Sequence, residues 1–363
     1  MMDLEVVGGG PSGSIAAASA AQKGLKTIIY EEHKKCGEPE NCSGLFSVDG
    51  LESLKEFGDY KKTVIKPIYG AEVHFGNRRM IIEKTNPVAY VCNRAELDQR
   101  FSENAQKEGV IVQNGSRVQP PNLKSERIIG ADGPLSSVAT HFKFPKIEKF
   151  ASTLQARVKV ELEQKKLVQV YLDNNKYPGF FGWVIPHNEE EAEIGVGGVF
   201  PNKPLLGFQN LIKLMQIKNP DSIKPKGWTI PIRVRKKTAG IFGSKKVVLV
   251  GDAAGQVKST TGGGVIFGGN CAKMAGKMID NPLEYEKEWR KQFGADLALH
   301  GFVQSALENL SIGAIEKMGG ILEKIRANEY LSKYGHMDKP TKMIKPQFLL
   351  HLLNTFSGIK NLD

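Results

Sequence analysis

The chain has 363 residues, 40% of them apolar, so it is long enough for two or three domains and apolar enough for a sizeable core. This composition excludes an intrinsically disordered protein. The four cysteines (Cys36, Cys42, Cys92 and Cys271) are unsuited to a disulfide scaffold or a structural zinc site, which fits a reducing cytosol and predicts no metal. The apolar stretches near the N-terminus are short and broken by glycine, so we expect neither a signal peptide nor a membrane span there.

The formal net charge of +11 suggests an anionic partner. The lysines are scattered along the chain, and no nucleic-acid module or interleaving of aromatic with basic residues is visible, so we expect no nucleic-acid partner. An anionic membrane surface and an acidic electron donor remain as partners. The alternative is that the lysines form only a solvated surface.

The first thirty residues have the pattern of a dinucleotide-binding β-α-β unit. A short apolar strand leads into a Gly-x-Gly-x-x-Gly turn, a helix rich in small residues follows, and a second strand ends on an acidic residue. The expected parts are strand 4–7, Gly8, Gly10 and Gly13, helix 14–23, and strand 26–31 ending at Glu31. Glu31 would accept hydrogen bonds from ribose hydroxyls, and its charge argues against the 2′-phosphate of NADP at this site.

The middle of the chain changes to a different periodicity. Residues 66–83 and 152–199 alternate apolar and polar side chains, as half-buried antiparallel strands do. Helix 94–107 and strands near 110–112, 125–133 and 247–250 return to the parallel sheet, and the chain after Gly264 is expected to be mostly helical.

We therefore predict an α/β protein with a Rossmann-like nucleotide-binding domain, an inserted antiparallel β-sheet domain for the substrate, and a helical C-terminal region. The predicted bounds are 1–65, 88–141 and 240–300 for the first domain, 66–87 and 142–239 for the second, and 301–363 for the helical region.

A second glycine-rich turn follows the last buried strand. It contains Gly251-Asp252-Ala253-Ala254-Gly255 and, a few residues on, Thr261-Gly262-Gly263-Gly264. Like the first turn, it can bring backbone N–H groups close to a phosphate, and it adds the carboxylate of Asp252. Two such turns, separated by most of the chain, predict that both ends of the chain fold around one long cofactor, FAD. Asp132-Gly133 lies between them and by itself has the pattern of a simple turn.

The order of these motifs around an inserted sheet domain resembles the p-hydroxybenzoate hydroxylase superfamily of flavoproteins, over roughly residues 3–300. The resemblance implies that the first glycine turn holds the ADP half of FAD and that Asp252 contacts the ribityl and pyrophosphate region. It also implies that the helix after Gly264 directs its N-terminus at the phosphates, where the helix dipole favours anions.

Two further motifs narrow the resemblance. The first is a cysteine loop, Gly-Glu-Pro-Glu-Asn-Cys-Ser-Gly-Leu-Phe-Ser at 37–47, and the second is Phe-Gly-Trp-Val-Ile-Pro at 181–186 with Gly195 nine positions on. Both resemble the geranylgeranyl reductase family, especially its archaeal digeranylgeranylglycerophospholipid reductases. The resemblance implies flavin contacts from Gly8, Gly10, Ser12, Gly13, Glu31, Cys42, Ser43, Gly44, Arg94, Val118, Asp132, Asp252, Gly264 and Val265. It implies a prenyl-binding surface of Phe181, Trp183, Pro186 and Gly195.

The chain departs from the family pattern at several positions. Phe181 replaces a tyrosine and Ile185 a phenylalanine, which keeps the surface apolar but removes a hydroxyl. Ser259 stands where the family usually has proline, and the C-terminal part is short. These departures leave open whether the substrate is a phospholipid, a diphosphate or a quinone tail.

The family resemblance implies an FAD-dependent reductase that saturates the prenyl double bonds of an isoprenoid lipid. An isolated alkene accepts hydride poorly, so we expect protonation to lead or accompany hydride transfer, with Cys42 or an ordered water as the proton donor. No second Gly-x-Gly-x-x-Gly turn with strand context exists for NADPH. The family resemblance then implies electrons from ferredoxin or from NAD(P)H visiting the flavin, and the basic surface favours an acidic ferredoxin.

Three alternatives share the flavin fold. One is an aromatic hydroxylase, and another is a halogenase, because residues 181–186 are one residue from the Trp-x-Trp-x-Ile-Pro pattern of that group. The third is an electron-transfer flavoprotein that reduces a quinone.

The tail Phe348–Phe356, flanked by Lys342, Lys345 and Lys360, fits either a core helix or a membrane-surface helix. We expect a cytoplasmic protein, peripheral at the inner face of the cell membrane.

Overall fold

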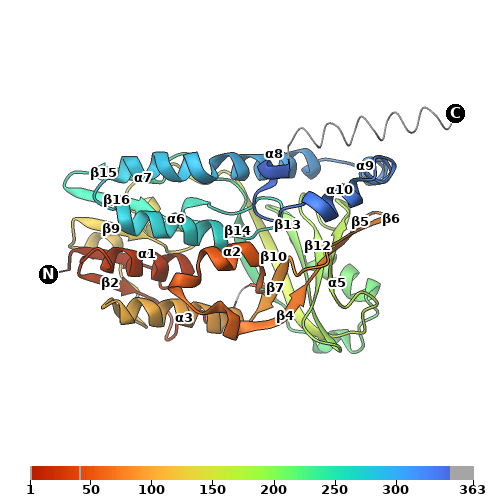
Figure 1. The fold of residues 1–363 in the computed structure, drawn as a ribbon, viewed down its shortest axis with the longest axis horizontal. Coiled ribbons are helices and arrows are strands. Elements are labelled where there is room, and N and C mark those ends of the chain that lie inside the picture. The colour runs from red at the N-terminus through yellow and green to blue at the C-terminus, as the bar shows by residue number, and fades with distance from the viewer. Residues whose placement is uncertain (1, 41, 344–363) are drawn as a thin grey trace. The chain divides into compact units, whose positions relative to one another are not determined.

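The computed structural model describes residues 2–40 and 42–343, which form two compact units (Figure 1). Unit 1 combines the chain up to Val64 with Cys92–Phe150 and Thr229–Ala298. Unit 2 combines Ile65–Val91, Ala151–Trp228 and the described chain from Leu299 to Met343. Each unit is thus assembled from segments distant in sequence. The predicted tail at Phe348–Phe356 lies outside the described residues.

Unit 1 is built on a six-stranded sheet in the order β15-β16-β9-β1-β2-β8. The strands are parallel except for the antiparallel edge pair of β15 and β16. Their bounds are β1 Leu4–Val7, β2 Thr27–Tyr30, β8 Ile111–Gln113, β9 Arg127–Gly130, β15 Ala239–Phe242 and β16 Lys245–Leu249. The four residues of β1 are all buried, as expected of a strand covered on both faces.

The helices of unit 1 surround this sheet. They are α1 Pro11–Ala21, α2 Val48–Ser53, α3 Arg94–Lys107, α4 Ser137–His141, α6 Val265–Met278 and α7 Pro282–Trp289, with short helical turns at Lys55–Phe57, Tyr60–Thr63, Pro120–Asn122, Gly251–Ala254 and Arg290–Gly294. Residues 13–20 of α1 are buried on every side, which their small side chains permit. A Cβ atom at Gly276 of α6 would lie 2.3 Å from the carbonyl oxygen of Ala16, so glycine lets the two helices touch at the backbone.

Unit 2 is built on a seven-stranded sheet in the order β14-β10-β13-β12-β11-β5-β6. The described pairs are antiparallel except for β11 with β5, which are parallel. The bounds are β5 Gly70–Phe75, β6 Arg78–Glu83, β10 Phe150–Lys159, β11 Leu167–Leu172, β12 Gly182–Pro186, β13 Glu191–Val199 and β14 Lys226–Pro231. The remaining short strands are β3 Leu45–Ser47, which belongs to unit 1, and β4 Val64–Ile68 and β7 Ala89–Cys92, which belong mostly to unit 2.

Helix α5 (Leu205–Leu214) covers one face of this sheet. Its Phe208, Leu211 and Ile212 join a core with Val184 of β12 and Ile194 of β13. The remaining helices are α8 Ala295–Glu308, where the chain passes into unit 2, α9 Ile312–Lys324 and α10 Ala327–Tyr334, with short turns at Pro220–Ser222 and Pro340–Met343.

These elements confirm the predicted fold class: a parallel sheet with a fingerprint turn, an antiparallel sheet inserted in the sequence, and a helical C-terminal region as far as the structure describes it. Helix α1 begins three residues earlier than predicted, because Pro11 is compatible with the first helical position. Within the described part of the chain, no helix is both long and apolar enough to cross a bilayer.

Candidate functional site

The turn between β1 and α1 has no room for side chains at two of its motif glycines. A Cβ atom at Gly8 would lie 2.3 Å from the carbonyl oxygen of Ala131, and one at Gly13 would lie 1.9 Å from that of Gly8. Gly8 also has a φ of 100°, in the left-handed region that favours glycine. A Cβ at Gly10 would meet no atom within 4 Å. Gly8 and Gly13 therefore allow close packing, whereas Gly10 faces open space at the N-terminus of α1, where a phosphate can approach the backbone.

Glu31 is held beside this turn. Its Oε2 accepts the N–H of Gly9 at 2.7 Å, and its Oε1 accepts the backbone N–H of His33 at 2.9 Å. The Nδ1 of His33 lies 2.7 Å from the same Oε1. The predicted ribose-binding carboxylate is thus buried, oriented by two backbone donors, and in contact with the glycine turn that precedes α1.

The two glycine-rich turns, far apart in the sequence, meet within unit 1. Cβ atoms at Gly251 and Gly268 would lie 2.5 and 2.7 Å from the Oγ of Ser12, the second residue of α1. Gly251 has a φ of 62°, and Gly264 is the N-terminal cap residue of α6. Neither Gly264 nor Gly10 offers a side chain to cap its helix. The N-termini of α1 and α6 are thus both free of a capping side chain, which suits an extended anionic ligand.

Asp252 faces the cap of α6. A Cβ at Gly264 would lie 2.8 Å from its Oδ1. Among the described residues no group donates a hydrogen bond to this carboxylate, which is partly exposed. Desolvation by the surrounding protein raises the pKa of Asp252 to about 6, against the opposing effect of the Arg94 charge. A desolvated carboxylate without donors is costly. A ligand that presents hydroxyl or N–H groups here would remove that cost.

The positively charged Arg94 interacts with Cys42 of the cysteine loop. Arg94, the first residue of α3, pairs with Asp98 through Nε–Oδ1 and Nη2–Oδ2 distances of 2.7 and 3.0 Å. Burial disfavours the guanidinium charge, but Asp98 and Cys42 outweigh burial and raise the pKa of Arg94 above its ordinary value. The sulfur of Cys42 accepts the N–H of Gly44 at 3.5 Å, and Cys42 interacts electrostatically with the Arg94 guanidinium. One cation therefore acts on both Cys42 and Asp252.

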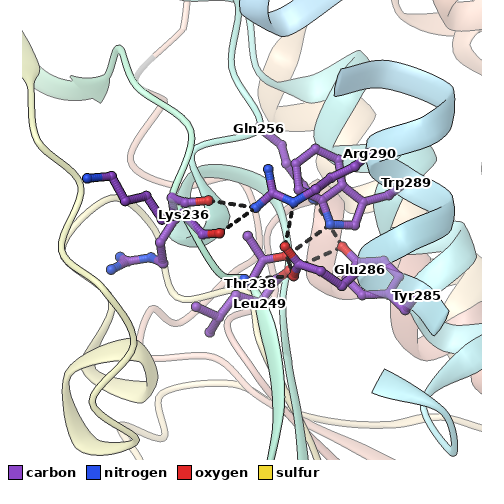
Figure 2. A network of polar contacts seen from close by, with 9 residues as sticks. Lys236, Thr238, Leu249, Gln256, Tyr285, Glu286, Trp289 and Arg290 are labelled. Carbon is purple, nitrogen blue, oxygen red and sulfur yellow. Dashed lines mark hydrogen bonds and ion pairs between the residues drawn. The ribbon is translucent and has the colours of Figure 1, made fainter. Parts of the chain in front are cut away.

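A buried polar network behind the second turn holds its backbone in place (Figure 2). The Oε1 of Gln256 accepts the N–H of Gly251 at 2.9 Å. Its Nε2 donates to the Tyr285 hydroxyl at 3.0 Å. That hydroxyl donates to the carbonyl of Leu249 at 3.2 Å. Gln256 and Tyr285 are completely buried. Helix α7 and the end of β16 thus fix the peptide that begins the turn.

A second branch of the network reaches the same turn from its other end. Arg290 donates from Nε to Glu286 at 2.5 Å and from Nη2 to the carbonyl of Arg235 at 2.9 Å. The other oxygen of Glu286 accepts the N–H and hydroxyl of Thr238 at 2.7 and 2.5 Å. Arg235 in turn donates from Nε to the carbonyl of Ala253 at 3.0 Å. Hydrogen bonds from both sides therefore hold the turn.

Two predicted contact residues have structural partners in unit 1. The carboxylate of Asp132 accepts the hydroxyls of Ser136 and Ser137 at 2.5 and 2.9 Å and the N–H of Val138 at 3.0 Å, so it supports the N-terminus of α4, whose cap residue is Ser136. Val118 packs against the core beside β9 and β16. Direct contacts of Asp132 and Val118 with a cofactor remain predictions, as do those of Ser43, next to Cys42, and Val265, which begins α6.

In unit 2 the predicted Trp183 and Gly195 are paired directly across β12 and β13. A Cβ at Gly195 would lie 2.2 Å from Cζ2 of Trp183, so the indole lies on bare backbone. A Cβ at Gly197 would likewise lie 2.2 Å from Cδ1 of Phe180, so this ring also lies on bare backbone. The ring centroid of Phe181 is 4.5 Å from that of Phe180 and 5.5 Å from that of Trp183. Three aromatic rings thus form one continuous apolar cluster.

Several residues in these two regions were not anticipated. Phe180 joins the aromatic cluster, and Glu193 accepts the indole N–H of Trp183 at 3.4 Å. The predicted Pro186 lies at the far end of β12, paired with Ala192. The Phe180-Phe181 doublet was a visible signal, whereas the partners of Gln256 lie too far along the chain to be found by spacing.

The geometry of unit 1 fits FAD on three independent observations. In the glycine turn, a side chain at Gly8 or Gly13 would clash with backbone, whereas one at Gly10 would meet no atom within 4 Å. Two uncapped helix N-termini meet at Ser12. Asp252 is a desolvated carboxylate with no donor among the described residues. Phosphates suit the helix N-termini, and ribose or ribityl hydroxyls suit Glu31 and Asp252.

Comparisons with known proteins agree with this geometry. The sequence profile of a family described as FAD dependent oxidoreductase matches residues 3–131. The chain is 28% identical to an uncharacterized protein of Methanocaldococcus jannaschii over 94% of this chain and 93% of that protein. It is 26% identical to a digeranylgeranylglycerophospholipid reductase of Methanosarcina acetivorans over 89% of each. A geranylgeranyl bacteriochlorophyll reductase-like structure from Thermoplasma acidophilum aligns with a TM-score of 0.76 and 20% identity, covering 98% of this chain and 96% of that one.

These sequence comparisons indicate an FAD-dependent oxidoreductase and confirm the predicted cofactor and enzyme class. Within that class, the resemblance to the geranylgeranyl reductase family that the motifs predicted is also confirmed, because it extends along nearly the whole chain.

Proposed function

We propose that this protein is an FAD-dependent reductase that saturates the prenyl double bonds of an isoprenoid lipid, with an archaeal-type digeranylgeranylglycerophospholipid as the first candidate substrate. The observation that carries the proposal is the coexistence of the FAD-type turn with the aromatic cluster in a chain that resembles such reductases over 89% of its length. Bound FAD would supply the hydride for the reduction.

The chain's own residues have distinct proposed roles. Gly8, Gly10, Ser12, Gly13, Glu31, Ser43, Gly44, Arg94, Val118, Asp132, Asp252, Gly264 and Val265 are proposed to hold the cofactor. Phe181 and Trp183, with Pro186 and Gly195, are proposed to bind the prenyl chain through apolar contact. Replacing the family's tyrosine by Phe181 leaves the cluster without a hydroxyl at that position, which suits a hydrocarbon chain.

Cys42 is the proposed proton donor. It interacts electrostatically with the Arg94 guanidinium, which is held in place by Asp98. A Cys42→Ala variant is expected to retain FAD but lose most of its turnover, and Cys42→Ser to recover part of it. Full turnover by Cys42→Ala would assign the proton to another donor.

The electron donor is proposed to be ferredoxin or NAD(P)H, and a peripheral position at the cytoplasmic face of a membrane is proposed because the substrate is a lipid. The net charge of +11 supports both an acidic donor protein and an anionic surface.

Single-turnover oxidation tests the proposal. Anaerobic, dithionite-reduced protein is mixed with digeranylgeranylglyceryl phospholipid in detergent, and the molecular mass of the lipid is then measured by mass spectrometry. We expect reoxidation of the flavin and a gain of two hydrogens for each double bond reduced. A flavin that stays reduced until a quinone is added would instead support an electron carrier. Oxygen-dependent turnover of a phenol or a chloride-dependent product would support a hydroxylase or a halogenase.

A further inference from the structure

The segment between β13 and α5 presents large apolar side chains to solvent. Phe200, Leu205 and Leu206 are 70%, 52% and 72% exposed. They lie within seven residues at the end of one strand and the start of one helix of unit 2, so their side chains belong to one local surface. We call Phe200, Leu205, Leu206 and the nearby Lys203 and Lys213 the basic-apolar patch.

The exposure of this patch follows from the packing of its neighbours. Helix α5 alternates pairs of buried and exposed residues, with Gly207, Phe208, Leu211 and Ile212 turned inward. A Cβ at Gly207 would lie 2.5 Å from the carbonyl oxygen of Lys176, so the start of the helix is seated against backbone. With the inner face filled, residues 205, 206, 209, 210, 213 and 214 are turned outward.

The turn before α5 is also held in place. Asn202 donates to the carbonyl of Val199 from its backbone at 3.0 Å and from its side chain at 2.9 Å. These bonds close the chain around Phe200. Its exposed ring is therefore part of an ordered turn and is not the consequence of a loose end.

The segment that carries the patch has charge of one sign only. Lys203, Lys213 and Lys218 are exposed, and no acidic residue occurs between Glu193 and Asp221. Among the described residues, none of these three lysines forms an ion pair. Apolar tips surrounded by unpaired lysines are complementary to an anionic lipid headgroup layer over an acyl boundary. Three apolar side chains are few for a stable protein–protein interface, which typically buries about 800 Å² on each partner.

We propose that the basic-apolar patch docks this protein on an anionic membrane surface, with Phe200, Leu205 and Leu206 inserted among the headgroups and Lys203 and Lys213 over the lipid phosphates. The proposal rests on the proposed function in that a membrane-dissolved prenyl lipid requires the enzyme to reach the bilayer. It adds the surface and the chemistry by which the enzyme does so.

Vesicle co-sedimentation of the full-length holoprotein tests the proposal. The vesicles are either phosphatidylcholine alone or equal parts of phosphatidylcholine and phosphatidylglycerol. We expect binding to the anionic vesicles that falls with added salt. The double variant Phe200→Ser/Leu206→Ser is expected to lose about tenfold or more in partition coefficient. Lys203→Glu/Lys213→Glu is expected to lose a similar factor on anionic vesicles only.

Matched controls come from unit 1. Leu135 and Leu283 are 77% and 60% exposed but lie outside the patch, so Leu135→Ser/Leu283→Ser is expected to bind vesicles like the wild type. The tail beyond residue 343 is retained in every variant. Wild-type protein that ignores anionic vesicles, or patch variants that bind as the wild type does, would overturn the proposal. A patch that instead controls dimerisation in light scattering, without vesicle binding, would identify a second copy as its occupant and also overturn it.

Single turnover in detergent separates this proposal from the proposed function. The patch variants are expected to reduce detergent-dispersed lipid at the wild-type rate and to lose activity only on vesicles. Wild-type protein that binds vesicles but reduces no prenyl lipid in detergent would leave the docking surface in place and contradict the proposed function alone.

Discussion

The FAD-type turn of unit 1 and the aromatic cluster of unit 2 both depend on glycine, but the glycines have different neighbours. A Cβ at Gly8 or Gly13 would collide with a backbone carbonyl oxygen, whereas one at Gly195 or Gly197 would collide with an aromatic ring. Backbone between a strand and a helix cannot move without breaking their hydrogen bonds, but a ring can rotate or shift. The first region is therefore intolerant of change, whereas the second can be reshaped.

The two regions also differ in how they are supported. Two branches of buried hydrogen bonds, through Gln256 and Arg235, hold the second turn of unit 1. The aromatic cluster is held by ring packing and by one hydrogen bond from Trp183 to Glu193. Directional bonds fix a cofactor site to within a narrow geometry, and apolar packing accepts ligands of related shape. This difference suits a fixed cofactor and a flexible prenyl chain.

Substitution at Gly13 is expected to have the largest effect. In Gly13→Ala the new Cβ would lie 1.9 Å from the carbonyl oxygen of Gly8, so we expect loss of FAD affinity by a factor on the order of 100 and a lower Tm. The flavin-to-protein ratio and the thermal unfolding of the apoprotein measure these effects. Gly10→Ala is the matched comparison, because its Cβ meets no atom within 4 Å: the apoprotein should melt normally while FAD binds about tenfold more weakly. Normal flavin content in Gly13→Ala would contradict the backbone argument.

Substitution at Gly195 should leave FAD binding intact and slow the reduction of the prenyl substrate. The Cβ of Gly195→Ala would lie 2.2 Å from the indole of Trp183, which must shift. We expect unchanged flavin content, altered tryptophan fluorescence and about tenfold slower reduction of prenyl lipid, since a misplaced contact surface costs orientation. Adding Trp183→Leu should relieve the clash. A wild-type turnover rate in Gly195→Ala would contradict a role of the aromatic cluster in substrate binding.

Asp252 is expected to produce a smaller, pH-dependent effect. Because its folded pKa is raised to about 6, the protonated form is favoured in the folded apoprotein, and its stabilising contribution is lost as pH rises from about 4 through 6. Asp252→Asn should remove this decline, which is worth roughly 1–2 kcal/mol after allowance for partial exposure. Urea unfolding of both apoproteins across this pH range measures it. Asp280 is the control of opposite sign: its pKa is lowered, since hydrogen bonds from Lys246 and Arg127 outweigh desolvation, so its contribution is lost as pH falls. Parallel pH profiles for wild type and Asp252→Asn would contradict the assignment.

Local sequence predicted the elements that depend on near neighbours. Strand β1, the glycine turn, α1 and Glu31 were predictable because a dinucleotide-binding turn needs its glycines and acid at short, regular separations. The alternating segments of unit 2 were predictable because alternation of side chains is a property of each strand by itself. Trp183 and Gly195 were predicted from the family resemblance, and the structure pairs them across β12 and β13.

Contacts between distant segments were decided only by the tertiary structure. Spacing alone could not bring Ser12 to Gly251 and Gly268, or assign both carboxylate oxygens of Asp132 to the N-terminus of α4. The same holds for Arg235, Gln256 and Tyr285, whose partners come from other strands and helices. Periodicity reports which face of an element is buried, but the identity of the group across that face depends on how the elements pack. The sequence therefore determined the fold class and the presence of a nucleotide turn, and the packing of strands and helices determined what holds that turn in place.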